Sequence, residues 1–251
     1  MTDASKTSRL RRWIVGGALA SSVLALLLAG AAFWLLATAS GAQFVLDRAM
    51  ALAGGSLGTV EGRLVGPIAV DAVEIATPAL RLRAKRVALD WSPSRLLGGE
   101  VRIERLHAAS LEIATAKSSA PAREPATLAL PVRLHVEHGS VDRLLVGTLA
   151  EDAGGVELRD VSVKFAASHA AWILGGAEAS TPIGRAKLAG TVGAKAPFPI
   201  DIKGELAGTR GDRAYRAAVA AVGTLAKIDA SLDASEGGLS GKASAKVEPF
   251  S

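Results

Sequence analysis

The order of hydrophobic and polar positions divides the chain into three parts. Residues 13–39 form an apolar stretch without a charged, amide or proline residue. Residues 40–55 repeat apolar positions at helical spacing and end in two glycines, which predicts a short amphipathic helix with a glycine cap. From residue 56 onward, apolar and polar residues alternate in short runs that Gly, Pro or Ser interrupts. This alternation is typical of half-buried β-strands.

The apolar stretch at 13–39 is long enough to cross a membrane as a helix, since a bilayer core requires about 20 residues. Indole rings near both ends suit the two interfaces, because tryptophan favours the headgroup level. We expect a transmembrane anchor whose main apolar contacts come from Trp13, Leu24, Leu26, Leu27, Leu28, Phe33 and Trp34.

Basic residues set the expected orientation. The tail at 1–12 carries Lys6, Arg9, Arg11 and Arg12, and no basic residue follows the stretch until Arg48. Positive charge stays on the cytoplasmic side, so the sequence predicts a single-pass membrane protein with a cytoplasmic N-terminus and the remainder outside the cytoplasm. The absence of cysteine suits a bacterial periplasm for this remainder. The alternative is a cleaved signal peptide, for which Ala37 to Ala39 supplies an A-x-A pattern, although an apolar signal core is usually only about 7 to 15 residues long.

The alternating region predicts about thirteen strands and no intervening helix, which favours an elongated, curled antiparallel or repeat-like sheet. The sequence VGTLA occurs twice, at 146–150 and 222–226, and supports a repeating unit. Pro121, Pro125 and Pro131 mark a linker at 117–131. This linker separates a first β segment at 56–116 from a second, repeat-like segment at 132–251.

One strand face is expected to be apolar. Its candidate members are Val87, Leu89, Trp91, Val101, Ile103, Val161, Val163, Phe165, Ile200 and Ile202. Such a face either packs against a second sheet as a closed sandwich core or lines a groove for acyl chains. Composition alone favours the sandwich, because a long exposed apolar strip promotes aggregation unless something covers it.

Charge and residue chemistry add exclusions. The net charge is +5, but the tail at 1–12 holds four basic residues and one acid, so only +2 belongs to the exported part. The high net charge therefore says little about anionic partners, and we expect no nucleic-acid partner because this part of the chain would lie beyond the membrane. Cysteine is absent, and neither GxSxG nor HExxH occurs. The sequence predicts no enzyme, no cofactor and no metal site.

Residues 56–113 carry a more specific pattern. A glycine-rich turn comprises Gly58, Gly62, Leu64, Gly66 and Pro67, and it is followed by the segment Asp90, Trp91, Ser92 and Pro93 and by Leu96, Leu97, Gly98 and Gly99. In this order and spacing, together with the N-terminal anchor, the sequence resembles the N-terminal region of the TamB family.

The resemblance implies a function. Members of this family are inner-membrane subunits of the bacterial translocation and assembly module, and they look like long curled sheets whose apolar groove conducts phospholipid toward the outer membrane. They are associated with an outer-membrane barrel partner, TamA, in the assembly of autotransporters and other outer-membrane proteins. The resemblance therefore turns the preference from a sandwich to a groove. Since TamB proteins are much longer, we expect this sequence to be an N-terminal fragment.

Overall fold

The computed structural model describes residues 30, 33–52, 54–116, 124–149 and 155–250. Within them it contains helix α2 (Ala39–Leu52), 3-10 helix η1 (Pro93–Gly98) and thirteen strands. The strands are β1 (Gly55–Leu57), β2 (Val60–Gly62), β3 (Ile68–Ala76), β4 (Leu80–Trp91), β5 (Glu100–Thr115), β6 (Arg133–Thr148), β7 (Val156–Ala167), β8 (Ala171–Thr181), β9 (Gly184–Gly193), β10 (Pro199–Arg210), β11 (Arg213–Thr224), β12 (Lys227–Glu236) and β13 (Leu239–Val247).

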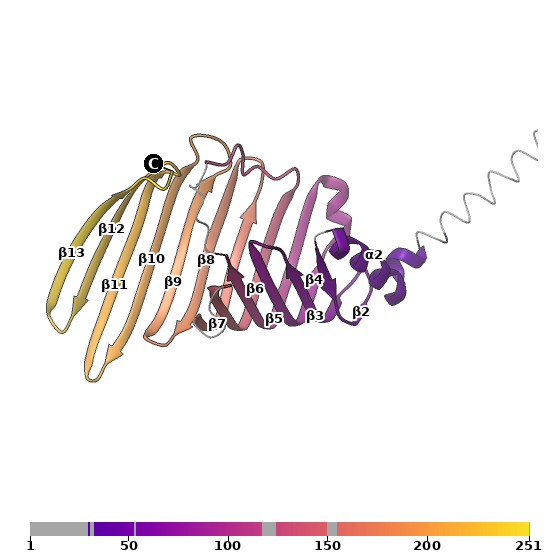
Figure 1. Ribbon diagram of the computed structural model, residues 1–251, viewed down its shortest axis with the longest axis horizontal. Coiled ribbons are helices and arrows are strands. Elements are labelled where there is room, and N and C mark those ends of the chain that lie inside the picture. Colours follow the sequence, from indigo (N-terminus) through magenta and orange to yellow (C-terminus); the bar gives the residue numbers. More distant parts are fainter. Residues whose placement is uncertain (1–29, 31–32, 53, 117–123, 150–154, 251) are drawn as a thin grey trace, which may run out of the picture.

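All the described strands belong to one open, curved sheet (Figure 1). From β3 to β13 each strand pairs with its neighbours in chain order, and β1 and β2 both pair with β3. Every pair is antiparallel except β5 with β6, which run parallel. The expectation of an elongated, curled β-sheet is confirmed. The parallel pair is the one departure from a purely antiparallel arrangement among these strands.

The parallel pair requires a crossover, since the chain must return along the whole length of β5 before β6 begins. The expected linker at 117–131 makes this return, and its residues 117–123 lie outside the described ranges. At its far end, Leu128 N donates to Ala194 O at 3.0 Å and Leu130 N donates to Ser168 O at 3.3 Å. The linker therefore joins two neighbouring strands of one sheet and rests on the loops after β7 and β9.

Two residues with left-handed backbone conformations adjust the alternation along the strands. Arg86 has a φ of 50° and Asp160 a φ of 51°. At the first, Lys85 pairs with Ala72 while Val87 pairs with Val70, so Arg86 on β4 and Asp71 on β3 are both left out of the pairing. A left-handed residue within a strand interrupts the alternation of its side chains and so changes which face the following side chains occupy. Arg81, Arg83 and Lys85 thus share the face opposite Val87, as the sequence pattern predicts.

The helix predicted at 40–55 is present as α2, and Gly54 follows it with a φ of 72°. Among the described residues, no helix is both long enough and apolar enough to span a membrane. The predicted anchor at 13–39 falls largely outside those residues, as do Trp13 and the four leucines assigned to it, so it stays a prediction. Of its expected anchor residues, Phe33 and Trp34 are described, and Trp34 contacts Phe44 with ring centroids 6.2 Å apart.

Among the described residues, a cluster of buried apolar side chains lies where α2 covers the sheet. There Ala42 of the helix packs with Val60, Ile68 and Val70 of the first strands, and all four are buried. Within the described ranges no second sheet packs on the first, and apart from the contacts of α2 and η1 the strands chiefly contact their neighbours in the sheet. The closed-sandwich alternative is therefore wrong for this part of the chain.

Candidate apolar groove

The strand register gathers apolar side chains onto one face, because residues directly opposite each other in a sheet point to the same side. One row crosses the sheet from β3 to β13 without a charged or polar side chain. Its members are Ile68, Leu89, Leu106, Gly139, Val163, Ala177, Leu188, Gly204, Val219, Leu232 and Ala243.

Parallel rows extend this face. A second row, from β4 to β13, consists of Trp91, Ile103, Val136, Phe165, Leu174, Gly190, Ile202, Ala221, Ala230 and Ala245. A third, from β5 to β13, consists of Val101, Leu134, Ala167, Trp172, Val192, Ile200, Gly223, Ile228 and Val247. A fourth, from β2 to β7, consists of Val60, Val70, Val87, Ala108, Val141 and Val161. We call these four rows the apolar face.

All ten residues predicted for the apolar face lie in these rows. The prediction included no residue of β2, β3, β6, β8, β9 or β11 to β13. On β8, β9 and β11 to β13, seven of the fifteen row residues are alanine or glycine. The alternation is clear on β12, where Ile228, Ala230 and Leu232 are separated by polar residues, but it is absent from residues 217–221 of β11, which are four alanines and a valine. Alanine and glycine differ less from polar residues in hydrophobicity than valine, leucine and isoleucine do. The pattern of apolar and polar positions therefore has weak contrast in this part of the sequence.

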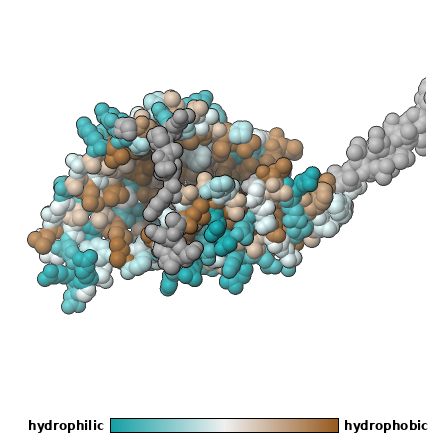
Figure 2. Space-filling model, in the orientation of Figure 1, coloured by the Kyte–Doolittle hydropathy of each residue, from teal (hydrophilic) through white to brown (hydrophobic). Residues whose placement is uncertain are grey.

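The apolar face is open to solvent over much of its area. Leu188 is 42% exposed, Val219 47% and Leu232 39%. Figure 2 shows hydrophobic residues gathered in a hollow of the molecule, with hydrophilic residues around its rim. Over β10 to β13 the face forms a depression of about 290 Å³, and its lining includes Ile202 and Leu232 together with several alanines. The small residues therefore leave space that larger side chains would fill.

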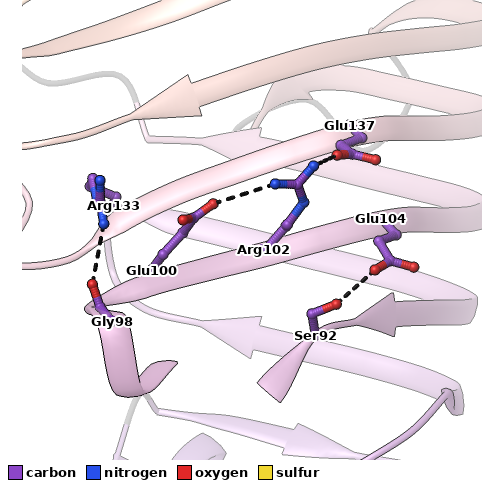
Figure 3. Close-up of polar contacts among 7 residues, drawn as sticks. All are labelled: Ser92, Gly98, Glu100, Arg102, Glu104, Arg133 and Glu137. Atoms are coloured by element: carbon purple, nitrogen blue, oxygen red, sulfur yellow. Dashed lines mark hydrogen bonds and ion pairs between the residues drawn. The ribbon is translucent and has the colours of Figure 1, made fainter. Parts of the chain in front are cut away.

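The opposite face of the sheet, which we call the polar face, carries the charges. Ion pairs bridge neighbouring strands there, such as Arg83 with Glu74 at 2.9 Å and Lys187 with Glu178 at 3.0 Å. In Figure 3, Arg102 lies between Glu100 and Glu137 on β5 and β6. In a sheet that is charged on one face and apolar on the other, only the charged face interacts favourably with water.

Two carboxylate contacts shift ionisation on the polar face. Arg159 Nε donates to Glu157 Oε1 at 2.8 Å, and Arg143 Nη2 donates to Glu157 Oε2 at 3.2 Å. The hydrogen bond from Arg159 and the positive charges of both guanidinium groups lower the pKa of Glu157. The Glu74 carboxylate likewise raises the pKa of Arg83 by hydrogen bonding and by its charge. The contacts of Arg143 with Glu157 and of Arg83 with Glu74 join neighbouring strands on the polar face.

One cluster on the polar face brings together a serine, a histidine and an aspartate. His107 Nδ1 lies 3.0 Å from Ser140 Oγ, and its Nε2 lies 3.7 Å from Asp142 Oδ2. The side chains of His107 and Asp142 are 44% and 63% exposed, so water competes for both. Among the described residues no group of acidic, histidine or cysteine side chains could hold a metal ion. The absence of enzymatic activity stays a prediction.

The motif residues of the first strands have structural positions. Gly66 and Pro67 lie in the turn between β2 and β3, where Gly66 N donates to Arg63 O at 3.0 Å. The left-handed glycine of this turn region is Gly62, with a φ of 100°. Asp90 binds Arg105 at 3.0 Å across β4 and β5. Trp91 is the last residue of β4, and Pro93 begins η1, which contains Leu96 and Leu97.

The family of this chain follows from its match to a protein-family model. The family model described as "TamB, N-terminal domain" matches residues 27–154, about half of the chain. The chain belongs to the TamB family. The matched region runs from the residues before α2 through β6 and so includes the turn, the Asp90–Pro93 segment and the parallel crossover. Comparisons with curated proteins and with solved structures returned no match.

Proposed function

We propose that this chain is an inner-membrane-anchored, periplasmic scaffold of the translocation and assembly module that carries phospholipid acyl chains toward the outer membrane. The observation that supports this most is the continuity of the apolar face. Its longest row crosses the sheet from β3 to β13 without a charged or polar side chain. Spaced at about 4.8 Å per strand, these eleven strands extend for roughly 50 Å.

Acyl chains suit this surface for a physical reason. Burying apolar area releases about 25 cal/mol per Å², and an acyl chain recovers this along its whole length only when the contact surface is continuous. The groove is open on one side, so a lipid whose tails lie on the apolar face keeps its headgroup in water. Binding of acyl chains requires no base, nucleophile or metal ion, so we assign the groove neither catalysis nor a cofactor.

Family membership supports the wider role. We propose that lipid delivery serves the assembly of outer-membrane proteins, including autotransporters, together with the outer-membrane barrel TamA. The proposed location is the inner membrane, with the described sheet in the periplasm. This topology rests on the basic residues before the apolar stretch and on family membership.

A photo-crosslinking experiment in living cells tests the lipid proposal. A photoreactive phenylalanine analogue is placed at Val163 or Ile202 on the apolar face of the full chain, and adducts are detected by radiolabelled phosphate. Ile173 and Val222 are the matched controls, because they are apolar, 45% and 43% exposed, and on the polar face. We expect phospholipid adducts at Val163 and Ile202 only. Equal labelling at all four positions would overturn the proposal.

A second measurement tests whether lipid moves along the face. Val163→Asp places a charge in the longest row between the first strands and Ile202. If lipid enters at the membrane-anchored end, this substitution lowers the phospholipid adduct at Ile202, whereas Ile173→Asp on the polar face leaves that adduct unchanged. An undiminished adduct at Ile202 in folded Val163→Asp protein would contradict transport through this row.

A further inference from the structure

Helix η1 presents leucines to solvent although its backbone is firmly held. Leu97 is 95% exposed and Leu96 is 44% exposed. The helix nevertheless has defined contacts: Arg95 N donates to Ser92 O at 3.1 Å, and Gly99 N donates to Leu96 O at 2.9 Å. Arg133 Nη2 also donates to Gly98 O at 3.2 Å (Figure 3). The leucines thus project from a fixed support, and nothing among the described residues covers Leu97.

The exposed leucines lie at the end of the strands that is nearest the apolar stretch. Ile68 begins β3 and pairs with Leu89 near the end of β4, so the turn before β3 and the connection after β4 are neighbours at the same end of the strands. In that turn Val65 is 47% exposed, and its backbone N–H donates to Leu36 O at 3.1 Å. Since Leu36 belongs to the stretch at 13–39, this end of the strands is the one joined to the predicted membrane anchor.

Positive charge accompanies the apolar residues. Arg63 lies in the turn with Val65, and Arg95 lies in η1 beside Leu96. Both side chains are exposed, and neither has an ion-pair partner among the residues that the structure describes. Exposed leucines flanked by unpaired arginines are the chemistry that binds a bilayer surface with anionic lipids.

We propose that Leu96, Leu97 and Val65, flanked by Arg63 and Arg95, form a second membrane contact that rests on the bilayer from which the chain emerges. We call these five residues the membrane-docking edge. The inference deepens the proposed function and depends on its anchored topology. A second contact fixes the tilt of the sheet, which a single helix leaves free to rotate. The first strands of the sheet then stay next to the bilayer, and acyl chains enter the apolar face beside the residues that α2 covers.

The absence of cysteine permits a direct test with single-cysteine variants of the full chain. Leu97→Cys is labelled with an environment-sensitive fluorophore and reconstituted into vesicles of phosphatidylethanolamine and phosphatidylglycerol that contain spin-labelled phospholipid. The control is Ile183→Cys, because Ile183 is 62% exposed in the turn between β8 and β9, at the opposite end of the strands. We expect at least three-fold stronger quenching at position 97. Equal quenching at both positions would overturn the inference.

The charge component has its own test. Arg63→Glu together with Arg95→Glu is expected to reduce the quenching at position 97 at least two-fold, and replacing phosphatidylglycerol by neutral phosphatidylcholine should do the same. Quenching that is unaffected by both changes would overturn the role of the arginines. Lipid adducts at Val163 without quenching at position 97 would reject the membrane-docking edge alone. Quenching without adducts would reject the lipid groove and leave the docking edge standing.

Discussion

The side-chain amide of Gln43 binds the backbone of Val60 at the free edge of the sheet. Gln43 Oε1 accepts from Val60 N at 2.7 Å, and Gln43 Nε2 donates to Gly58 O at 3.2 Å. One amide thus makes the two bonds that a neighbouring strand would make. Because unpaired edges recruit strands of other molecules, this contact both joins α2 to the sheet and protects its first edge.

Replacing this amide should loosen the joint between helix and sheet. In Gln43→Leu, the Val60 N–H and the Gly58 carbonyl lose their partner, and leaving such groups unsatisfied costs about 1–3 kcal/mol. We expect faster hydrogen exchange at the Val60 amide. Gln43→Glu is the matched control, because it keeps an oxygen acceptor for Val60 and loses only the donor to Gly58. Unchanged exchange at Val60 in Gln43→Leu would show that the amide does not hold the edge.

Two tryptophans on the apolar face differ in what their indole N–H groups bind. Trp172 Nε1 donates to Leu128 O of the crossover at 2.7 Å, whereas Trp91 Nε1 is buried without a hydrogen-bond partner among the described residues. Trp172→Phe should therefore lower the free energy of unfolding by about 0.5–1.5 kcal/mol, and Trp91→Phe should cost less. Thermal unfolding of the two variants compares them. Equal losses would mean that this hydrogen bond does not fasten the crossover.

Much of this architecture could be predicted from the sequence because large apolar residues mark strand faces clearly. Val87, Leu89 and Trp91 alternate with Ala88 and Asp90, and the structure places the three large residues on the apolar face. The shift after the basic run was also readable, since Arg86 interrupts the period of two and takes a left-handed conformation. Strong contrast between neighbouring side chains made these assignments reliable.

Other features depend on long-range pairing that local patterns do not encode. A proline-containing linker predicts a break, but it does not reveal that β5 and β6 pair in parallel. The two VGTLA segments look equivalent in sequence, yet Val146 lies on the same face as Ile113, while Val222 lies on the polar face beside Asp201. Gln43 gave no signal either, because its role depends on a strand edge 15 to 17 residues away.

Acid should weaken the ion pairs around Glu157. Its pKa is lowered from an ordinary value of 4.5, chiefly by the hydrogen bond from Arg159. A lowered folded-state pKa means that this contact stabilises the fold above pH 4.5 and that the stabilisation is lost as pH falls through the folded-state pKa. Arg159→Leu should raise the pKa of Glu157 toward 4.5, as measured by carbon-detected NMR titration. Arg143→Leu should raise it less, and a larger rise in that variant would contradict the assignment.

The close approach of β9 and β10 beneath the apolar face depends on a glycine. A Cβ added at Gly190 would lie 2.5 Å from Asp201 O and 2.7 Å from Ile202 Cα, and backbone atoms cannot move aside as a flexible side chain can. Gly190→Ala should therefore destabilise the fold by about 1–3 kcal/mol. Gly176→Ala on β8 is the control, since a Cβ there meets nothing within 4 Å, and its loss of unfolding free energy should be near zero. If chemical denaturation gives the two variants equal stability, β9 and β10 lie farther apart than the register indicates, and the row through Ile202 is not continuous at this point.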